Sequence, residues 1–229
     1  MEKRTIVLAT YGAARAHEHG DCMDVLQHQL GVLVMQTRGS SQIDMARSHL
    51  AEMAMAHGAD VVVFIDHDIL FDPLDVERLA DVARVARGIV GAPYAQRAMG
   101  AGVVGGLDPE VGEVVFFEGG SLYPSTGAIG MGFTAIHREV FEKLNTLPEY
   151  AQVLSQEGLL RPYFKKLVVN GYWLKEDASF CHAARQVGVS TQIDTRIRVK
   201  HWGDHPFGIE DCLKRTTEPP TLRLKTRSV

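Results

Sequence analysis

The sequence has 229 residues with 24 basic and 28 acidic side chains, which gives a formal net charge of −4. That charge gives no support to a general DNA- or RNA-binding surface, which is strongly basic. Hydrophobic residues make up 45% and charged residues 23%, so the chain can bury a core and is not disordered over most of its length. Its three cysteines, Cys22, Cys181 and Cys212, form no CxxC pair, which excludes a disulfide framework and a zinc ribbon.

Membrane and secretory segments are not indicated. The longest strongly apolar run, Val61–Ile65, is too short to cross a bilayer and is closed by Asp66. The apolar stretch Thr5–Thr10 near the N-terminus is too short for the core of a signal peptide. We therefore expect a soluble cytoplasmic protein with no membrane partner.

The first half of the chain alternates between predicted strands and helices. Apolar, β-branched segments predict strands at 5–10, 31–35, 61–65 and 89–90. Apolar residues at helical spacing predict helices near 22–29, 41–57 and 73–87. Ser41 and Asp44 have the spacing of a capping box, and Asp72 before Pro73 is a typical helix start. This alternation predicts an α/β fold with a mostly parallel central sheet flanked by helices.

The second half is less regular, with many glycines over 99–132 and an irregular stretch at 146–172. Further elements are expected along it: a hairpin strand at 113–118, a strand at 132–136, helices at 138–144 and 176–187, and a last strand at 191–199. We expect residues 1–215 to form one domain and residues 216–229 to form a loose C-terminal tail.

The most informative stretch is Asp66-His67-Asp68, which follows the apolar strand. In open α/β sheets, ligands bind at the carboxyl ends of the strands. Residues two apart at a strand end point the same way, so Asp66 and Asp68 could face one hard cation. Placing two like charges beside a buried strand is costly without a cation, which favours a metal site over a plain turn. The open positions of such a cation suit the oxygens of a diphosphate.

Two other segments could belong to the same site. In Thr10-Tyr11-Gly12, after the first strand, the ring could stack on a base and the glycine would allow a close backbone approach. An ordinary turn is an equally good reading of these residues. Arg47 lies early in the second helix and could reach a phosphate or a base, although a solvated arginine is the commoner case.

Candidate catalytic and metal-binding residues also occur late in the chain. Glu176 and Asp177 are adjacent carboxylates at a helix start, where the helix dipole alone would favour them. Alternatively, one of them is a general base while other groups anchor its neighbour. His201 closes the last strand, either as a neutral imidazole ligand or as a polar residue at a strand end.

A structural zinc site is a weaker hypothesis. His17, His19, Asp21 and Cys22 are closely spaced and could supply ligands, but no second cluster with usual zinc spacing accompanies them. A plain polar loop over 13–21 is therefore favoured.

Taken in order, these segments resemble the GT-A glycosyltransferases, closest to the small, family-two-like members of bacteria and phages. The resemblance covers roughly residues 5–205 and depends on the order of short motifs. They are Thr10-Tyr11-Gly12, Ala46-Arg47-Ser48, Phe64-Ile65-Asp66-His67-Asp68, Gly130-Met131-Gly132-Phe133, Glu176-Asp177 and Val199-Lys200-His201.

The resemblance implies a role for each segment. Asp66 and Asp68 match the DxD motif that holds Mn²⁺ or Mg²⁺ against the donor diphosphate, and His201 matches a histidine that completes the metal site. The nucleotide-binding residues would be Thr10, Tyr11, Gly12, Arg47, Asp66 and His67. Gly130, Met131 and Gly132 match a segment on the donor-sugar and acceptor side. Asp177 matches the general base of inverting members, with Glu176 as its support or alternative.

There are departures from the family pattern. Ser48 stands where the family usually has Asn, and His67 is a large residue for the middle of a DxD motif. The chain lacks the C-terminal extension of many polysaccharide-building relatives, which favours a soluble acceptor.

The expected activity is metal-dependent transfer of a sugar from a nucleotide-diphosphate sugar, a UDP-sugar by default, to an acceptor hydroxyl. The acceptor could be a small molecule, a glycan, a peptide or a nucleobase, and the stereochemistry is open. A nucleotidyltransferase is a rival, although the loop after the first strand lacks the expected glycine-rich, basic character. A nucleotide- or metal-binding module without turnover is the second rival.

Overall fold

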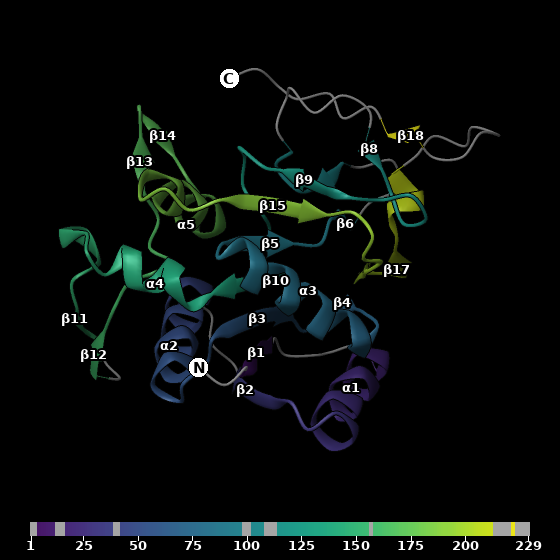
Figure 1. The fold of residues 1–229 in the computed structure, drawn as a ribbon, viewed down its shortest axis with the longest axis horizontal. Coiled ribbons are helices and arrows are strands. Elements are labelled where there is room, and N and C mark those ends of the chain that lie inside the picture. The colour runs from purple at the N-terminus through teal and green to yellow at the C-terminus, as the bar shows by residue number, and fades with distance from the viewer. Residues whose placement is uncertain are drawn as a thin grey trace.

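The computed structural model describes residues 4–11, 17–38, 42–97, 102–107, 114–155, 158–212 and 221–222. A seven-stranded sheet forms the centre, with strand order β2-β1-β3-β10-β5-β15-β9 (Figure 1). The bounds of these strands are β1 Thr5–Tyr11, β2 Leu33–Arg38, β3 Val61–Asp66, β5 Ile89–Gly91, β9 Leu122–Pro124, β10 Phe133–His137 and β15 Thr191–Asp194. In Figure 1 they stack from β9 at the top to β2 at the bottom.

Most of the sheet is parallel. Strands β2, β1, β3, β5 and β15 run in one direction, and only β10 and β9 among these seven run against them. The predicted α/β fold with a mostly parallel central sheet is therefore confirmed.

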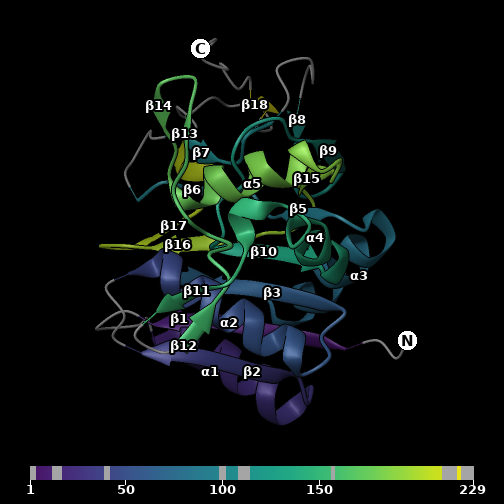
Figure 2. The same ribbon diagram turned by 90° about the vertical axis from the view of Figure 1, so that its left-hand side faces the viewer.

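Helices cover both faces of this sheet. They are α1 His17–Asp24, α2 Ile43–Ala56, α3 Pro73–Ala86, α4 Arg138–Leu144 and α5 Glu176–Gln186. One core cluster joins α2, α4 and α5 to one face, and a second joins α1 and α3 to the other. Figure 2 shows α2, α4 and α5 on the same side. Because both faces of β3 are covered, residues 61–65 are fully buried, which explains why that strand shows no polar alternation.

Short elements complete the fold. The pairs are β4 Ile69–Leu70 with β16 Lys200–Trp202, β16 with β17 Pro206–Phe207, β6 Tyr94–Ala95 with β7 Val103–Val104, β11 Val153–Ser155 with β12 Gly158–Leu160, β13 Val168–Val169 with β14 Tyr172–Trp173, and β8 Val114–Val115 with β18 Thr221–Leu222. A π-helical turn spans Val25–Gln29, and 3₁₀ turns span Pro148–Tyr150 and Ile209–Cys212. Among the described helices, none combines the length and the apolar composition that crossing a bilayer would require.

Helices α3, α4 and α5 begin at the predicted residues, Pro73, Arg138 and Glu176, whereas α1 and α2 begin elsewhere. The Asp72 carboxylate accepts a hydrogen bond from the Leu74 N–H (2.9 Å) before Pro73, as predicted. The first helix starts at His17, earlier than expected, so residues expected in a polar loop are helical. The second helix has Gln42 as its N-cap, without a side-chain cap, and Asp44 accepts from the Met45 N–H instead. The capping-box prediction rested on Ser41, which lies outside the described residues.

Later strands also depart from expectation. The segment 146–172, expected to be irregular, holds strands of two or three residues, which are too short to show an alternating pattern. Of the predicted strand 191–199, only Thr191–Asp194 forms a strand, β15. A turn follows at Thr195–Arg196, and the next strand, β16, begins at Lys200, beyond the predicted end. Strand β8 pairs with β18 near the C-terminus, so it is not part of a local hairpin.

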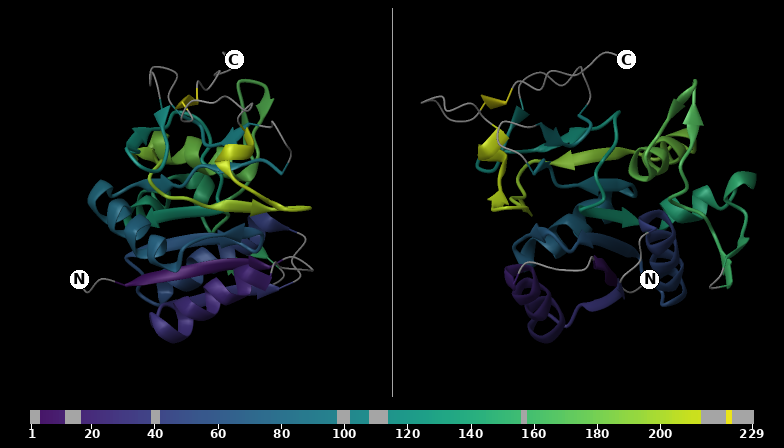
Figure 3. Two further views of the ribbon diagram at one scale, coloured as in Figure 1. Left: turned by 90° about the vertical axis from the view of Figure 1, so that its right-hand side faces the viewer. Right: turned by 180° about the vertical axis from the view of Figure 1, so that it is seen from behind.

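The topology brings distant segments to one edge of the sheet. Strand β1 has β2 on one side and β3 on the other, and residue Thr10 is the register partner of Asp66. Strand β16, close to the C-terminus, pairs with β4 and so lies beside the turn that follows β3 (Figure 3). In the β4–β16 pairing, His201 is opposite Ile69.

A buried ion pair fastens α3 to the start of the sheet. The Asp60 carboxylate accepts hydrogen bonds from Arg84 Nε and from the Arg4 N–H, both at 2.8 Å. Arg84 also donates to the Thr5 hydroxyl (2.6 Å). Burial acts to raise the pKa of Asp60, but the hydrogen bonds from Arg84 and Arg4 outweigh it and hold the pKa below its ordinary value.

We predict that Asp60→Asn lowers the free energy of unfolding by about 1.5–3 kcal/mol near neutral pH, because it removes hydrogen bonds to a charged group. A carboxyl whose pKa is lowered by folding stabilises the protein above its unfolded pKa of about 3.9 and loses this effect as the pH falls. The difference between the variant and the wild type should therefore shrink below about pH 4. Urea unfolding across this pH range measures both effects.

Asp81→Asn is the matched control, since Asp81 pairs with the same arginine but is about half exposed. Its change should stay below about 1 kcal/mol. Equal losses for the two variants would contradict the special importance of the Asp60 contact.

Candidate active site

The candidate site lies at the carboxyl ends of β1 and β3. The chain leaves β1 toward β2 on one side of the sheet and leaves β3 toward β5 on the other side, which makes the edge between β1 and β3 a topological switch point. Ligands of open α/β sheets bind in the crevice at such a point. Only the backbones of Thr10 and Tyr11 are described, and Gly12 lies outside the described residues. Their expected part in a nucleotide pocket stays a prediction.

A buried arginine joins two carboxylates at this edge. Arg47 Nη2 donates to both carboxylate oxygens of Asp66 at 3.0 Å, and Nη1 donates to Glu176 Oε1 at 3.2 Å. The Arg47 side chain is only 5% exposed. Burial acts to lower the pKa of Arg47, but the charge and hydrogen bond of Asp66 and the charge of Glu176 outweigh it, so the pKa lies above its ordinary value. The guanidinium therefore stays charged and links α2, β3 and α5.

In the Ala46-Arg47-Ser48 segment, which was expected to hold the nucleotide, Arg47 and Ser48 both bind other parts of the protein. Both terminal nitrogens of Arg47 are engaged by protein carboxylates, so a direct contact with a nucleotide stays a prediction. Ser48 is buried, donates to the backbone carbonyl of Asp44 (2.7 Å) and accepts from the Phe164 N–H (3.1 Å). Ser48 thus fastens α2 to the segment that follows β12.

A second cluster surrounds Asp68, which is 7% exposed. Its Oδ2 lies 3.4 Å from His201 Nε2 and forms an ion pair with Arg97 Nη2. Arg97 Nε donates to His201 Nε2 at 2.9 Å, and His201 Nδ1 lies 3.0 Å from the carbonyl oxygen of Ala95. The Trp202 N–H donates to the Asp68 carbonyl at 2.6 Å, which holds β16 against the turn.

The hydrogen bonds indicate how these groups are charged. A carbonyl oxygen only accepts, so Nδ1 of His201 donates to the Ala95 carbonyl, while Nε2 accepts from Arg97 Nε through its lone pair. Burial acts to raise the pKa of Asp68, but the groups that contact the carboxylate outweigh burial and place the pKa below its ordinary value. An ionised carboxylate and a neutral imidazole nitrogen are ligands that Mn²⁺ accepts. The donor atoms of Asp68 and His201 therefore fit the expected cation.

Asp66 does not join them. It contacts Arg47, and the described residues contain no group of three His, Cys, Asp or Glu side chains arranged to hold a metal ion. The expectation that Asp66 and Asp68 face the same way assumed a continuing strand. Strand β3 ends at Asp66, and His67 and Asp68 lie in a turn, so the two-residue period of a strand does not reach Asp68. His67 is half-buried in that turn, and its expected nucleotide contact stays a prediction.

Tyr94 is a central residue that the sequence reasoning missed. Its buried ring packs edge-on against the His201 ring, with centroids 5.3 Å apart. Burial first and the charge of Asp66 next raise the pKa of Tyr94, and the charge of Asp177 acts in the same direction. Tyr94 therefore contacts the His201 cluster and is also within the electrostatic influence of Asp66 and Asp177. The sequence feature that could have pointed to Tyr94 is its place shortly after β5, whose carboxyl end lies at the same edge of the sheet.

The glycines near 130 are explained by this tyrosine. A Cβ atom on Gly130 would collide with the Tyr94 hydroxyl, and one on Gly132 would lie 3.1 Å from it. The backbone of Gly132 acts on the Tyr94 phenol in the direction of a lower pKa, against the effect of burial. Met131 is 1% exposed and packs in the core. This segment thus supports the site through its backbone, and its expected contact with a sugar or acceptor stays a prediction.

The two carboxylates at the start of α5 have different surroundings. Glu176 is bound by Arg47, whereas Asp177 Oδ1 accepts a local hydrogen bond from the Ala178 N–H (2.7 Å). Burial raises the pKa of Asp177, and the neighbouring charge of Glu176 adds to the increase. A buried carboxylate with a raised pKa is a stronger base than an exposed one, as general-base catalysis requires.

The residues of the zinc hypothesis have structural contacts. His19 is buried, with Nδ1 2.8 Å from the Ile69 carbonyl, and Cys22 Sγ donates to the Phe71 carbonyl at 3.1 Å. These bonds fix α1 beside β4. Among the described side chains, His19, Asp21 and Cys22 belong to no metal-binding group. All four residues of the hypothesis lie on α1, so 17–21 are helical and not the polar loop expected.

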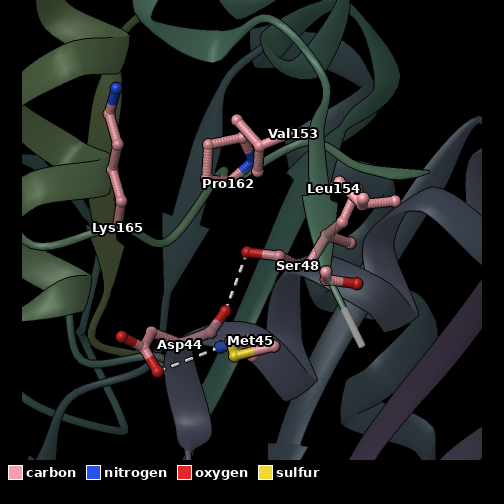
Figure 4. A pocket seen from close by; sticks show the side chains of 9 residues that line it. Asp44, Met45, Ser48, Val153, Leu154, Pro162 and Lys165 are labelled. Atoms are coloured by element: carbon pink, nitrogen blue, oxygen red, sulfur yellow. Dashed lines mark hydrogen bonds between the residues drawn. The ribbon is translucent and has the colours of Figure 1, made fainter. Parts of the chain in front are cut away.

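A separate cavity opens at the start of α2. Its volume is about 240 Å³, and its wall is mainly apolar (Figure 4). The lining residues are Asp44, Met45, Ser48, Val153, Leu154, Ser155, Leu160, Pro162 and Lys165. None of them belongs to the Asp68 cluster or to the carboxylates around Arg47, so the cavity is distinct from the candidate site.

Comparisons with known proteins place the fold. No family model matches the sequence, and no curated protein matches it. A solved structure, A197 from STIV, is similar to this chain with a TM-score of 0.58 and 16% identity, over 98% of this chain and 100% of A197. GalNAc-T7 with UDP, GalNAc and Mn²⁺ gives a TM-score of 0.47 and 15% identity, over 87% of this chain and 44% of that one.

A third structure, the inositol-1-phosphate CTP transferase from T. maritima, gives a TM-score of 0.42 and 9% identity, over 91% of each chain. Likeness at such identities concerns the fold alone. Of these three structures, A197 alone is similar enough to support a conclusion, and that conclusion is a shared α/β fold along nearly the whole chain.

Proposed function

We propose that the protein is a metal-dependent GT-A glycosyltransferase, which moves a sugar from a nucleotide-diphosphate sugar, a UDP-sugar by default, to an acceptor hydroxyl. One observation carries the proposal. A potential cation-binding pair, Asp68 and His201, lies at the same switch-point edge as a half-buried carboxylate of raised pKa, Asp177. Tyr94 packs against His201, and the charges of Asp66 and Asp177 act on its phenol.

The first cluster suits the donor half of the reaction. Asp68 and His201 would hold Mn²⁺ or Mg²⁺ through a carboxylate oxygen and the Nε2 lone pair. The bound cation would neutralise the negative charge that develops on the leaving diphosphate when the sugar–phosphate bond breaks. The hydrogen bond between His201 Nδ1 and Ala95 fixes the imidazole tautomer that such a ligand needs.

The second cluster suits the acceptor half. Asp177 would accept the proton of the attacking hydroxyl, while Arg47 neutralises and anchors Glu176. Arg47 acts here as a positioning residue, because it fixes the start of α5 relative to the end of β3. The Gly130–Gly132 backbone and Tyr94 would form the floor between donor and acceptor.

We predict that a nucleoside diphosphate, UDP by default, raises the melting temperature in the presence of Mn²⁺. A ligand that binds only the native state stabilises it by about 2.7 kcal/mol at a hundredfold excess over its dissociation constant. A thermal-shift panel of UDP, GDP, CDP and TDP, each with Mn²⁺ and with EDTA, measures the effect. The shift should be lost with EDTA and in Asp68→Asn.

The same panel separates the rival functions. A folded protein that responds to none of the four diphosphates would contradict a nucleotide-sugar donor. A shift produced by CTP or another triphosphate, but by no diphosphate, would favour a nucleotidyltransferase.

We predict that Asp177→Asn slows release of the nucleotide from its sugar donor by about 10²–10⁴-fold, the usual contribution of a general base. Nucleotide affinity should change little, because Asp177 would contact the acceptor. Nucleotide release with water as the acceptor can be followed without knowing the natural acceptor. A binding module without turnover would show no release in the wild type.

Glu176→Gln is the matched control on the neighbouring residue. It keeps the shape of the side chain but weakens the contact with Arg47, so we expect a smaller loss than for Asp177→Asn. A larger loss in Glu176→Gln would transfer the base role to Glu176.

A further inference from the structure

Arg97 contacts the two atoms that would bind a cation, His201 Nε2 and Asp68 Oδ2. Its Nε donates to His201 Nε2 at 2.9 Å, and its Nη2 forms an ion pair with Asp68 Oδ2. The side chains of Asp68 and His201 are 10% and 14% exposed, whereas that of Arg97 is 52% exposed. The long, half-exposed side chain of Arg97 therefore covers two largely buried ligand atoms, Asp68 Oδ2 and His201 Nε2.

The contacts of Arg97 exclude a metal ion at those atoms. His201 Nε2 accepts the Arg97 N–H through its single lone pair. A divalent cation would need the same lone pair and the same Asp68 oxygen. Guanidinium and metal ion also carry like charges, so both cannot lie between Asp68 and His201 at once.

We propose that Arg97 occupies the place of the cation in the cation-free protein and is displaced when the cation binds. The inference rests on the proposed function, since it concerns the same cation site. Arg97 keeps the buried Asp68 carboxylate paired, which a cation-free site would otherwise leave uncompensated. It thereby also competes with the cation and weakens its apparent affinity.

The exposure of Arg97 makes the exchange feasible. A half-exposed ion pair is worth little in water, and a divalent ion attracts the same carboxylate with twice the charge. Arg97 lies two residues beyond Ala95, whose carbonyl holds His201. Its side chain can therefore leave while the backbone contact that orients the imidazole remains.

The test is Mn²⁺ binding to the nucleotide-free full chain, measured by electron paramagnetic resonance of free Mn²⁺ and by calorimetry. Arg97→Met should bind Mn²⁺ about three- to tenfold more tightly than the wild type, because the competing ion pair and hydrogen bond are gone. Arg97→Lys, which keeps the charge but not the two-pronged geometry, should fall between them.

Arg87→Met is the matched control. Arg87 is 63% exposed and pairs with Glu139, a partner outside the candidate site, so its removal should leave Mn²⁺ affinity at the wild-type value. Circular dichroism and melting curves establish that each variant is folded. Binding by Arg97→Met alone, with none by the wild type, would also support competition.

Two results would overturn the inference in different ways. Equal Mn²⁺ affinity in Arg97→Met, Arg87→Met and the wild type would refute displacement and leave the proposed cation site standing. No binding by any folded variant would refute both displacement and the metal-dependent function.

Discussion

The buried guanidinium of Arg47 is the constraint on which the candidate site depends. It touches Asp66 and Glu176, which are 19 and 129 residues away in the sequence, and so joins three elements of the fold. Burying one cation between two carboxylates is tolerable because each charge has a partner. Without Arg47, Asp66 and Glu176 would lose the cation that they share, and α5 would lose its ion pair with α2.

The contact with Arg47 also gives Glu176 and Asp177 different properties. The two are adjacent at one helix start, yet Arg47 neutralises the first, and burial makes the second a stronger base. Such a difference between neighbouring carboxylates is a physical route to separate roles. The Asp68 cluster is organised on the same principle, since His201 is oriented by a backbone carbonyl and its other nitrogen is left to accept.

Much of the fold could be predicted from the sequence because its signals are local. The apolar run that forms β3 and the Asp72–Pro73 helix start depend on neighbouring residues alone. The position of Asp66 at a strand end was predictable for the same reason. Its separation from Asp68 was not, because it depends on where the strand stops and on a partner, Arg47, from another element.

The other site residues could not be predicted from the sequence because their roles depend on long-range contacts. Tyr94 and Arg97 belong to or follow a two-residue strand, which carries no periodic signal, and Arg97 meets His201 across 104 residues. The glycines at 130 and 132 were recognisable as unusual, but their reason is the Tyr94 hydroxyl on another strand. Sequence order alone could not place that hydroxyl beside them.

The most direct test of the whole account is a crystal structure of the protein grown with Mn²⁺ and the nucleoside diphosphate that it binds. Anomalous diffraction at the manganese edge locates the ion independently of any assumed site. The account predicts a single manganese peak bonded to Asp68 and His201, with the diphosphate beside it and the nucleoside along the ends of β1 and β3. Manganese and nucleotide bound elsewhere, with the Asp68–His201 pair unchanged, would contradict it.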